Sequence, residues 1–170
     1  MTRILVTHAT KTGCTAGVAE KIAETLTTSG ADVTVAPTSD RPDVASFDAV
    51  VLGSGVRAGQ WHGSARKLLE RDAAALAGKP LALFTVCLTM ADTPEKADEV
   101  RAYTEPLLQK AGLTPVDVGL FAGWFVPEHF GFVARTILKK MGAPEGDHRD
   151  WDKIEAWAKQ IAPEMTGREE

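Results

Sequence analysis

The sequence lacks any long apolar run and contains only two cysteines. No stretch approaches the roughly 18–20 consecutive apolar residues that span a bilayer. Polar residues follow the short opening run Ile4–Val6 at once, unlike a secretory signal peptide. Cys14 and Cys87 alone do not make the disulfide framework of a small secreted domain. We therefore expect a cytoplasmic protein without a transmembrane segment.

Positive charge is also scarce. With 19 Lys and Arg against 23 Asp and Glu, the formal net charge is −4, which argues against a nucleic-acid partner because non-specific binding needs a basic face. The acidity is nevertheless too mild for a dedicated electron shuttle. The 170 residues contain no repeat or low-complexity stretch and fit one domain. We place that domain at residues 1–165 and expect residues 166–170 to form a frayed tail.

Short apolar runs alternate with helical patterns along the whole chain. The runs at residues 4–6, 33–36, 49–52, 81–86 and 116–121 predict five strands. Apolar residues at helix spacing predict helices over residues 13–29, 65–76 and 93–111, and around residues 154–161. Strands separated by helices indicate right-handed crossovers and a parallel sheet.

The composition of the strands predicts their order in that sheet. The first, third and fourth strands are continuous apolar runs, typical of strands covered by helices on both faces. The second and fifth alternate apolar with polar residues or glycine, which suits the sheet edges. The prediction is an α/β doubly wound sheet of order 2-1-3-4-5 with helices on both faces. Its ligand site should lie at the carboxyl ends of strands one and three.

The loop at that position leads from the first strand into the first helix. Thr10, Thr12 and Thr15 flank Gly13 where the helix begins. Unpaired backbone N–H groups and the helix dipole favour a bound phosphate there, and glycine permits close approach of the ligand. The simpler alternative is that the three threonines are only N-cap and turn residues.

The pattern Thr10-x-Thr12-Gly13-x-Thr15 resembles the phosphate-binding loop of the flavodoxin family. All four motif positions match, whereas Cys14 stands where the family most often has Asn. The resemblance implies a flavodoxin-like fold with FMN as cofactor. It also implies a set of phosphate-binding residues: Thr10, Lys11, Thr12, Gly13, Cys14 and Thr15.

Further stretches resemble one branch of that family, the flavodoxin-type, quinone-dependent protoporphyrinogen oxidases. They are Gly53–His62, Val86–Leu88, Phe121–Gly123 and Phe130–Met141. The branch implies an FMN-dependent oxidoreductase that oxidises protoporphyrinogen IX and passes electrons to a quinone. No side chain is an obvious general base, so we name no catalytic residue. The alternative is an electron-transfer protein that shuttles between redox partner proteins, although the chain lacks strong acidity and a second stacking aromatic.

In the flavodoxin fold the loops after strands three and four sandwich the isoalloxazine ring of FMN. By resemblance, Trp61 is the candidate stacking side chain, with packing over the second helix as the alternative. Arg57 either stabilises charge on the reduced flavin or is a solvated surface residue. The second loop has no aromatic, so we expect one face of the ring to be open to a substrate. The implied ring contacts are Ser54, Gly55, Val56, Trp61, Cys87 and Leu88.

Other ligand motifs fit less well. Gly53–Ala58 formally matches the dinucleotide fingerprint G-x-G-x-x-G/A, but it follows the third strand, and Gly59 and Gly63 interrupt any helix start. A P-loop needs a Gly-Lys-Ser/Thr triplet, and the sequence has none. The cysteines and histidines match no zinc spacing, so we expect no metal.

Aromatic residues are few, yet they are concentrated. The chain has six Phe, four Trp and one Tyr, and five of these eleven lie between Phe121 and Phe132. The segment Trp124–Val133 either packs under the last helix or forms an apolar surface. Such a surface would bind a porphyrinogen or quinone, or touch the inner membrane surface peripherally, where Arg135, Lys139 and Lys140 would meet propionates or anionic headgroups. The sequence leaves the oligomeric state open.

Overall fold

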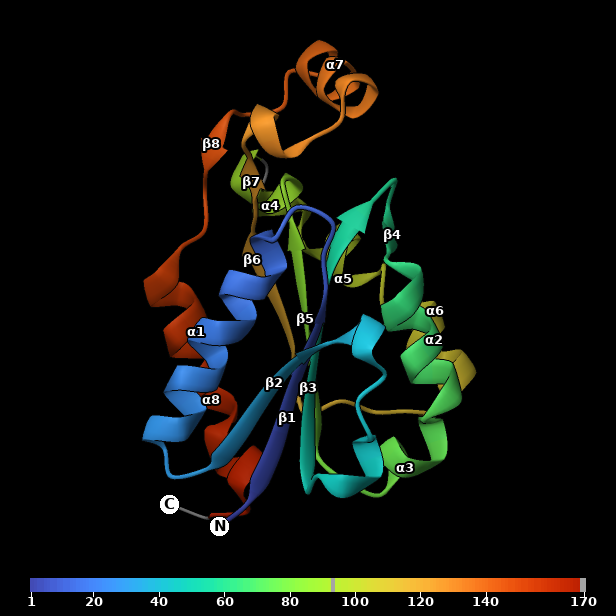
Figure 1. Cartoon of the computed structure of the whole chain (residues 1–170), viewed down its shortest axis with the longest axis vertical. Coiled ribbons are helices and arrows are strands. Elements are labelled where there is room, and N and C mark those ends of the chain that lie inside the picture. Colours follow the sequence, from blue (N-terminus) through green and yellow to red (C-terminus); the bar gives the residue numbers. More distant parts are fainter. Residues whose placement is uncertain (93, 169–170) are drawn as a thin grey trace.

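A parallel β-sheet forms the centre of the protein in the computed structural model, which describes residues 1–92 and 94–168 (Figure 1). Its strands are β1 (Arg3–Ala9), β2 (Asp32–Pro37), β3 (Ala49–Arg57), β5 (Leu81–Cys87) and β6 (Val118–Ala122), in the order β2-β1-β3-β5-β6. The predicted order 2-1-3-4-5 is confirmed, because β5 and β6 are the predicted fourth and fifth strands. All five carboxyl ends therefore lie along one edge, at the top of Figure 1.

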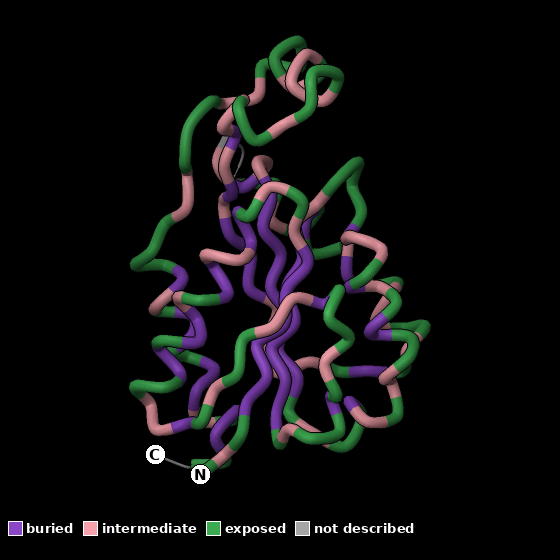
Figure 2. Tube along the Cα trace, in the orientation of Figure 1, coloured by how far each residue is buried: buried purple, intermediate pink, exposed green. Residues whose placement is uncertain are grey.

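Helices cover both faces of the sheet, as predicted. The helices α1 (Cys14–Thr28) and α8 (Trp151–Thr166) lie on one face, and α2 (Gly63–Arg71), α3 (Ala73–Ala77) and α6 (Glu105–Ala111) lie on the other (Figure 1). The strands β1 and β5 between them are almost entirely buried, whereas no residue of the edge strand β2 is buried (Figure 2).

Successive residues of the central strands contribute to two separate cores. Ile4 and Val6 pack with α1 and α8, whereas Leu5 between them packs with α2 and α3. Phe84 and Leu83 divide between the two cores in the same way. Because strand side chains point alternately to opposite faces, a strand covered on both faces is mostly apolar, although β1 also buries Thr7 and His8. That pattern is what predicted the three central strands.

Two predicted helices are interrupted in the structure. The helix predicted over residues 65–76 divides at Asp72 into α2 and α3. The one predicted over residues 93–111 follows a short helix, α4 (Thr89–Asp92), and is replaced by a 3₁₀ turn at Pro94–Lys96, α5 (Ala97–Arg101) and α6. Pro106 lies in the first turn of α6 and has no N–H to continue a helix from α5. The predicted start at Thr93 lies outside the described residues.

The chain also forms elements that the sequence did not indicate. A short strand, β4 (Gln60–Trp61), folds back antiparallel on β3. Past β6, β7 (Trp124–Phe125) pairs antiparallel with β8 (Gly146–Asp147), and α7 (Phe132–Lys140) lies between them. Three short 3₁₀ turns occupy residues 38–40, 44–46 and 127–129.

The end of the described chain is more ordered than expected. Thr166, predicted to begin a frayed tail, is the buried last residue of α8, and its carbonyl accepts a hydrogen bond from the Thr2 hydroxyl at 2.9 Å. Gly167 then ends the helix in the left-handed conformation. Among the described helices, none is both long and apolar enough to cross a membrane.

Candidate functional site

The predicted phosphate loop connects β1 to α1 at the carboxyl edge of the sheet. Gly13 immediately precedes the helix with φ of 86°, a left-handed conformation that favours glycine, and its N–H donates to the Thr10 hydroxyl at 3.1 Å. The helix has no side-chain cap at its N-terminus and no acidic residue in its first turn. The loop thus presents helix N–H groups that no side chain satisfies, an arrangement that suits an anion.

The side chains of this loop differ in accessibility. Lys11 and Gly13 are exposed and Thr10 and Thr12 are half-buried, whereas Cys14 and Thr15 are buried within the first turn of α1. A Cβ added to Gly13 would meet only the Trp124 ring, 4.0 Å away. The outer surface of the loop is therefore open where a ligand would approach.

Neither cysteine has the environment of a reactive thiol. Burial raises the pKa of Cys14 to about 11 and outweighs the opposing effect of Arg149. Burial likewise raises the pKa of Cys87. Both side chains are neutral packing thiols near neutral pH, so any contact of Cys14 with a phosphate would come from its backbone.

The hairpin of β3 and β4 follows the third strand. Its turn contains Ala58 and Gly59, with φ of 52° and 71°. The Ser54 hydroxyl is fully buried; it donates to the Gly55 carbonyl at 2.7 Å and accepts from the His62 N–H at 3.0 Å. Ser54 therefore stabilises the hairpin internally and does not present its hydroxyl to a ligand.

The structure does not favour Trp61 as a stacking residue. Its side chain is 2% exposed within the core beside α2, and its indole N–H donates to the Thr85 hydroxyl at 2.9 Å. A ring enclosed on both faces offers no surface to a planar cofactor. The alternative interpretation, packing against the second helix, fits this position.

The end of β3 meets the start of α1. A Cβ on Gly55 would lie 3.2 Å from both the Thr15 hydroxyl and His62 Nε2. Burial, together with the charges of Lys11 and Arg57, lowers the pKa of His62, so its imidazole is neutral near neutral pH. His62 was not among the site residues predicted from the sequence; its only signal was its place at the end of the stretch Gly53–His62 that follows the third strand.

The loop after β5 lies across from this hairpin. Cys87 is buried and Leu88 is half-buried. Tyr103 packs against the small core of Cys87, Met90 and Val100, and its ring lies 3.9 Å from where a Gly59 Cβ would be. Although the loop itself has no aromatic residue, the fold brings one beside it. This placement weakens the expectation that one ring face is left open.

The aromatic segment divides between core and surface. Phe121 and Phe125 are buried, whereas Phe132 and Val133 are 77% and 69% exposed. Trp124 lies between these extremes and contacts the phosphate loop, where its indole N–H donates to the Thr12 hydroxyl at 2.9 Å. Neither of the two predictions, packing under the last helix or an exposed apolar surface, therefore describes the whole segment Trp124–Val133.

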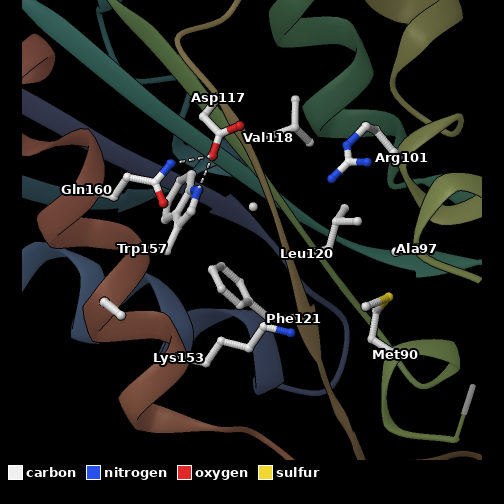
Figure 3. A pocket seen from close by; sticks show the side chains of 12 residues that line it. Met90, Ala97, Arg101, Asp117, Val118, Leu120, Phe121, Lys153, Trp157 and Gln160 are labelled. Atoms are coloured by element: carbon white, nitrogen blue, oxygen red, sulfur yellow. Dashed lines mark hydrogen bonds between the residues drawn. The ribbon is translucent and has the colours of Figure 1, made fainter. Parts of the chain in front are cut away.

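A separate cavity of about 370 Å³ lies along the outer edge of the sheet, between β6 and α8 (Figure 3). The Asp117 carboxylate at its rim already accepts hydrogen bonds from Trp157 at 2.8 Å and Gln160 at 3.4 Å (Figure 3). None of the predicted phosphate-binding or ring-contact residues lines this cavity.

The competing motifs find little support in the fold. Gly53–Ala58 lies in β3 and its turn, where no helix begins, and a Cβ on Gly53 would overlap the Phe84 ring. Packing thus accounts for this glycine without a dinucleotide. In residues 1–92 and 94–168, no three His, Cys, Asp or Glu side chains are grouped to hold a metal ion.

Curated proteins with one shared name are similar to this chain. Protoporphyrinogen IX dehydrogenase [quinone] from Escherichia coli K12 is 25% identical over 171 residues, covering 94% of each chain. The Leishmania major protein of that name is 24% identical over 128 residues, covering 70% of this chain and 55% of its own.

Solved structures share the fold. Oxidised flavodoxin 1 from Bacillus cereus matches 99% of both chains with a TM-score of 0.60 and 16% identity. Flavodoxin from Fusobacterium nucleatum bound to flavin mononucleotide covers 97% of this chain and 99% of its own, with a TM-score of 0.59 and 16% identity. The flavodoxin domain family matches residues 5–152. The chain therefore belongs to the flavodoxin domain family.

Proposed function

We propose that the protein binds FMN at the carboxyl edge of its sheet and acts as an FMN-dependent oxidoreductase. The observation that carries the proposal is the loop Thr10–Thr15, in which Gly13 leads into a helix whose N-terminus has no side-chain cap. The FMN phosphate would bind these N–H groups without displacing a protein side chain. When bound, FMN supplies the electron-transfer chemistry, and the protein positions the ring and excludes water.

The residues present fit this cofactor. The surface above Gly13 is open, and Lys11 and Arg57 are exposed cations near the carboxyl edge. The ring would lie between the β3–β4 hairpin and the loop after β5, where Gly55, Val56 and Leu88 are partly accessible. Ser54, Trp61 and Cys87 would support these loops from beneath, because their side chains are buried.

For the substrate, we propose protoporphyrinogen IX as electron donor and a quinone as acceptor. The names of the curated relatives support this choice. The alternative, a shuttle between redox proteins, is less favoured because a net charge of −4 gives only a weak field for steering a partner.

The test begins with an absorbance spectrum of the purified protein, followed by an anaerobic assay with protoporphyrinogen and menaquinone. A flavin spectrum with quinone-dependent porphyrinogen oxidation is the expected result. A flavin-loaded protein that oxidises no porphyrinogen would favour the shuttle. A colourless protein that FMN cannot reconstitute would contradict both functions.

We further propose that the helix α7 rests on an anionic membrane surface, which refines the contact predicted for Trp124–Val133. None of the residues of α7 is buried, and the helix projects from the carboxyl end of the sheet (Figures 1 and 2). Val133, Ile137 and Met141 follow one another at helix spacing and are 69%, 51% and 77% exposed. Lys139 and Lys140 are exposed beside them. Exposed apolar and basic residues together are typical of interfacial helices.

Vesicle sedimentation tests this contact. The double variant Val133→Ser/Ile137→Ser should bind phosphatidylglycerol vesicles roughly tenfold more weakly than the native protein, since it loses buried apolar area. Val35→Ser, at a 38% exposed site on β2, is the matched control. This proposal would be overturned if the native protein does not bind anionic vesicles, or if light scattering shows that it self-associates through α7.

A further inference from the structure

The ribbon of β7 and β8 is attached to the phosphate loop by side chains that the sequence analysis did not place there. Trp124 pairs with Asp147 across the ribbon, and its indole N–H donates to the Thr12 hydroxyl at 2.9 Å. Two residues past the ribbon's second strand, Arg149 Nη1 donates to the carbonyl of Cys14 at 3.3 Å. Both contacts join the loop to residues more than 100 positions away in the chain.

The hydrogen bond from Trp124 fixes the polarity of the Thr12 hydroxyl. An indole N–H can only donate, so the Thr12 oxygen is the acceptor. The hydroxyl proton of Thr12 is therefore left for another acceptor. The phosphate of FMN, when ionised, offers oxygens that accept such a proton, and donation to a charged group is stronger than donation to a neutral one.

Trp124 packs against Arg149, which forms an ion pair with Asp147. The guanidinium carbon of Arg149 lies 4.4 Å from the centroid of the Trp124 ring and 4.6 Å from that of Trp151. Asp147 accepts from Arg149 Nε at 2.9 Å and from Nη2 at 2.7 Å, and these bonds lower the pKa of the Asp147 carboxyl. The Arg149 side chain is only 11% exposed, so it is packed against its neighbours and is not a solvated surface charge.

Space for Arg149 is made by a glycine in α1. A Cβ on Gly17 would overlap the guanidinium group. In the present side-chain arrangement, the absence of a Cβ at Gly17 leaves room for the Arg149 guanidinium against the start of α1. The packing of α1, Arg149 and Trp124 is continuous from the helix to the loop.

We infer that Trp124 is a positioning residue that presents the Thr12 hydroxyl as a donor to the phosphate of FMN, and that Arg149 keeps Trp124 in place. The inference rests on the proposed binding of FMN at this loop. It goes further by assigning a role to a tryptophan outside the loop and by predicting that its effect passes through Thr12 alone.

The variant Trp124→Phe retains an aromatic ring at this position and removes the indole donor. Its dissociation constant for FMN should rise about three- to tenfold, the effect of one hydrogen bond, whereas binding of riboflavin, which has no phosphate, should change less than about twofold. Trp157→Phe is the matched control, because it removes an indole donor to Asp117 away from the loop and should leave both affinities unchanged. Melting temperatures of the apo variants show that each is folded.

A double-mutant cycle separates positioning from packing. Thr12→Val should weaken FMN binding by itself, and adding Trp124→Phe to it should cause no further loss. Two results would overturn the inference while leaving the proposed binding of FMN intact. In one, Trp124→Phe weakens FMN binding as much in the Thr12→Val background as in the native protein. In the other, Trp124→Phe weakens the binding of FMN and of riboflavin equally. Native protein that binds no FMN would overturn the proposed function and this inference together.

Discussion

Two histidines at the carboxyl edge of the sheet, His8 and His62, should make the stability of the fold depend on pH. Burial lowers the pKa of His8, opposed by Glu20 and Asp40, and burial also lowers the pKa of His62. The Nδ1 atom of His8 is buried and has no hydrogen-bond partner among the residues that the structure describes. Both side chains are therefore neutral in the folded protein at pH values where the unfolded chain is protonated.

Stability should consequently fall as the pH drops below about 6.5, the ordinary pKa of histidine, because the unfolded state then binds more protons. The double variant His8→Gln/His62→Gln should show a smaller decrease between pH 7.5 and pH 5.5. Urea denaturation at the two pH values measures the free energy of unfolding of the native protein and of the variant. An identical decrease in the variant would show that these histidines do not cause it.

The hairpin turn contains one strained residue. Ala58 has φ of 52°, a left-handed conformation that is unfavourable for residues with a Cβ. Ala58→Gly should raise the free energy of unfolding by about 1 kcal/mol. Ala156→Gly, at an exposed position within α8, should instead lower it by about 1 kcal/mol. A loss of stability in Ala58→Gly would contradict the assignment of strain.

The site residues show what a sequence pattern can and cannot predict. Thr10, Gly13 and Thr15 were placed correctly at the strand-to-helix junction, because that junction is local in the chain. The burial of Ser54 and Trp61 depends on β5 and α2 and could not be inferred from their neighbours. The contacts of Trp124 and Arg149 with the loop cross more than 100 residues, and no spacing rule reports them.

At the scale of elements, β3 and β5 fit together through one glycine. Gly53 pairs with Phe84, and a Cβ at Gly53 would overlap the Phe84 ring. Gly53→Ala should therefore lower the free energy of unfolding by about 1–3 kcal/mol, as overpacked cores do. Gly78→Ala, where nothing lies within 4 Å of the added carbon, is the control. Denaturation midpoints compare them, and equal midpoints would contradict this role for Gly53.

The central strands were predicted from their apolar runs, but their boundaries were not. The structure extends β1 beyond Ile4–Val6 through the buried polar residues Thr7 and His8 to Ala9. The helices on the second face were predicted as continuous, yet Asp72 and Pro106 interrupt them. The pairing of β7 with β8 joins residues that are 21 and 23 positions apart and was not visible in local patterns.

For the whole molecule, the distribution of aromatic residues explains how the fold carries both a candidate site and an exposed helix. Phe121 and Phe125 fix β6 and β7 in the core, while the chain beyond them leaves the sheet as α7 and returns as β8. The ribbon thus connects the exposed helix to the phosphate loop. The order of the strands was predicted from which strands are continuously apolar and which alternate with polar residues or glycine. The path of the chain away from the sheet through α7 and back as β8 was not predicted from the sequence.

Titration of the apoprotein with FMN, with binding measured by the quenching of flavin fluorescence, tests the central claim most directly. We predict saturable quenching with one equivalent of FMN, and weaker binding of Gly13→Ala, because that residue would be strained at φ of 86°. Quenching absent in native protein, or unchanged in Gly13→Ala, would contradict the assignment of this loop to the phosphate of FMN.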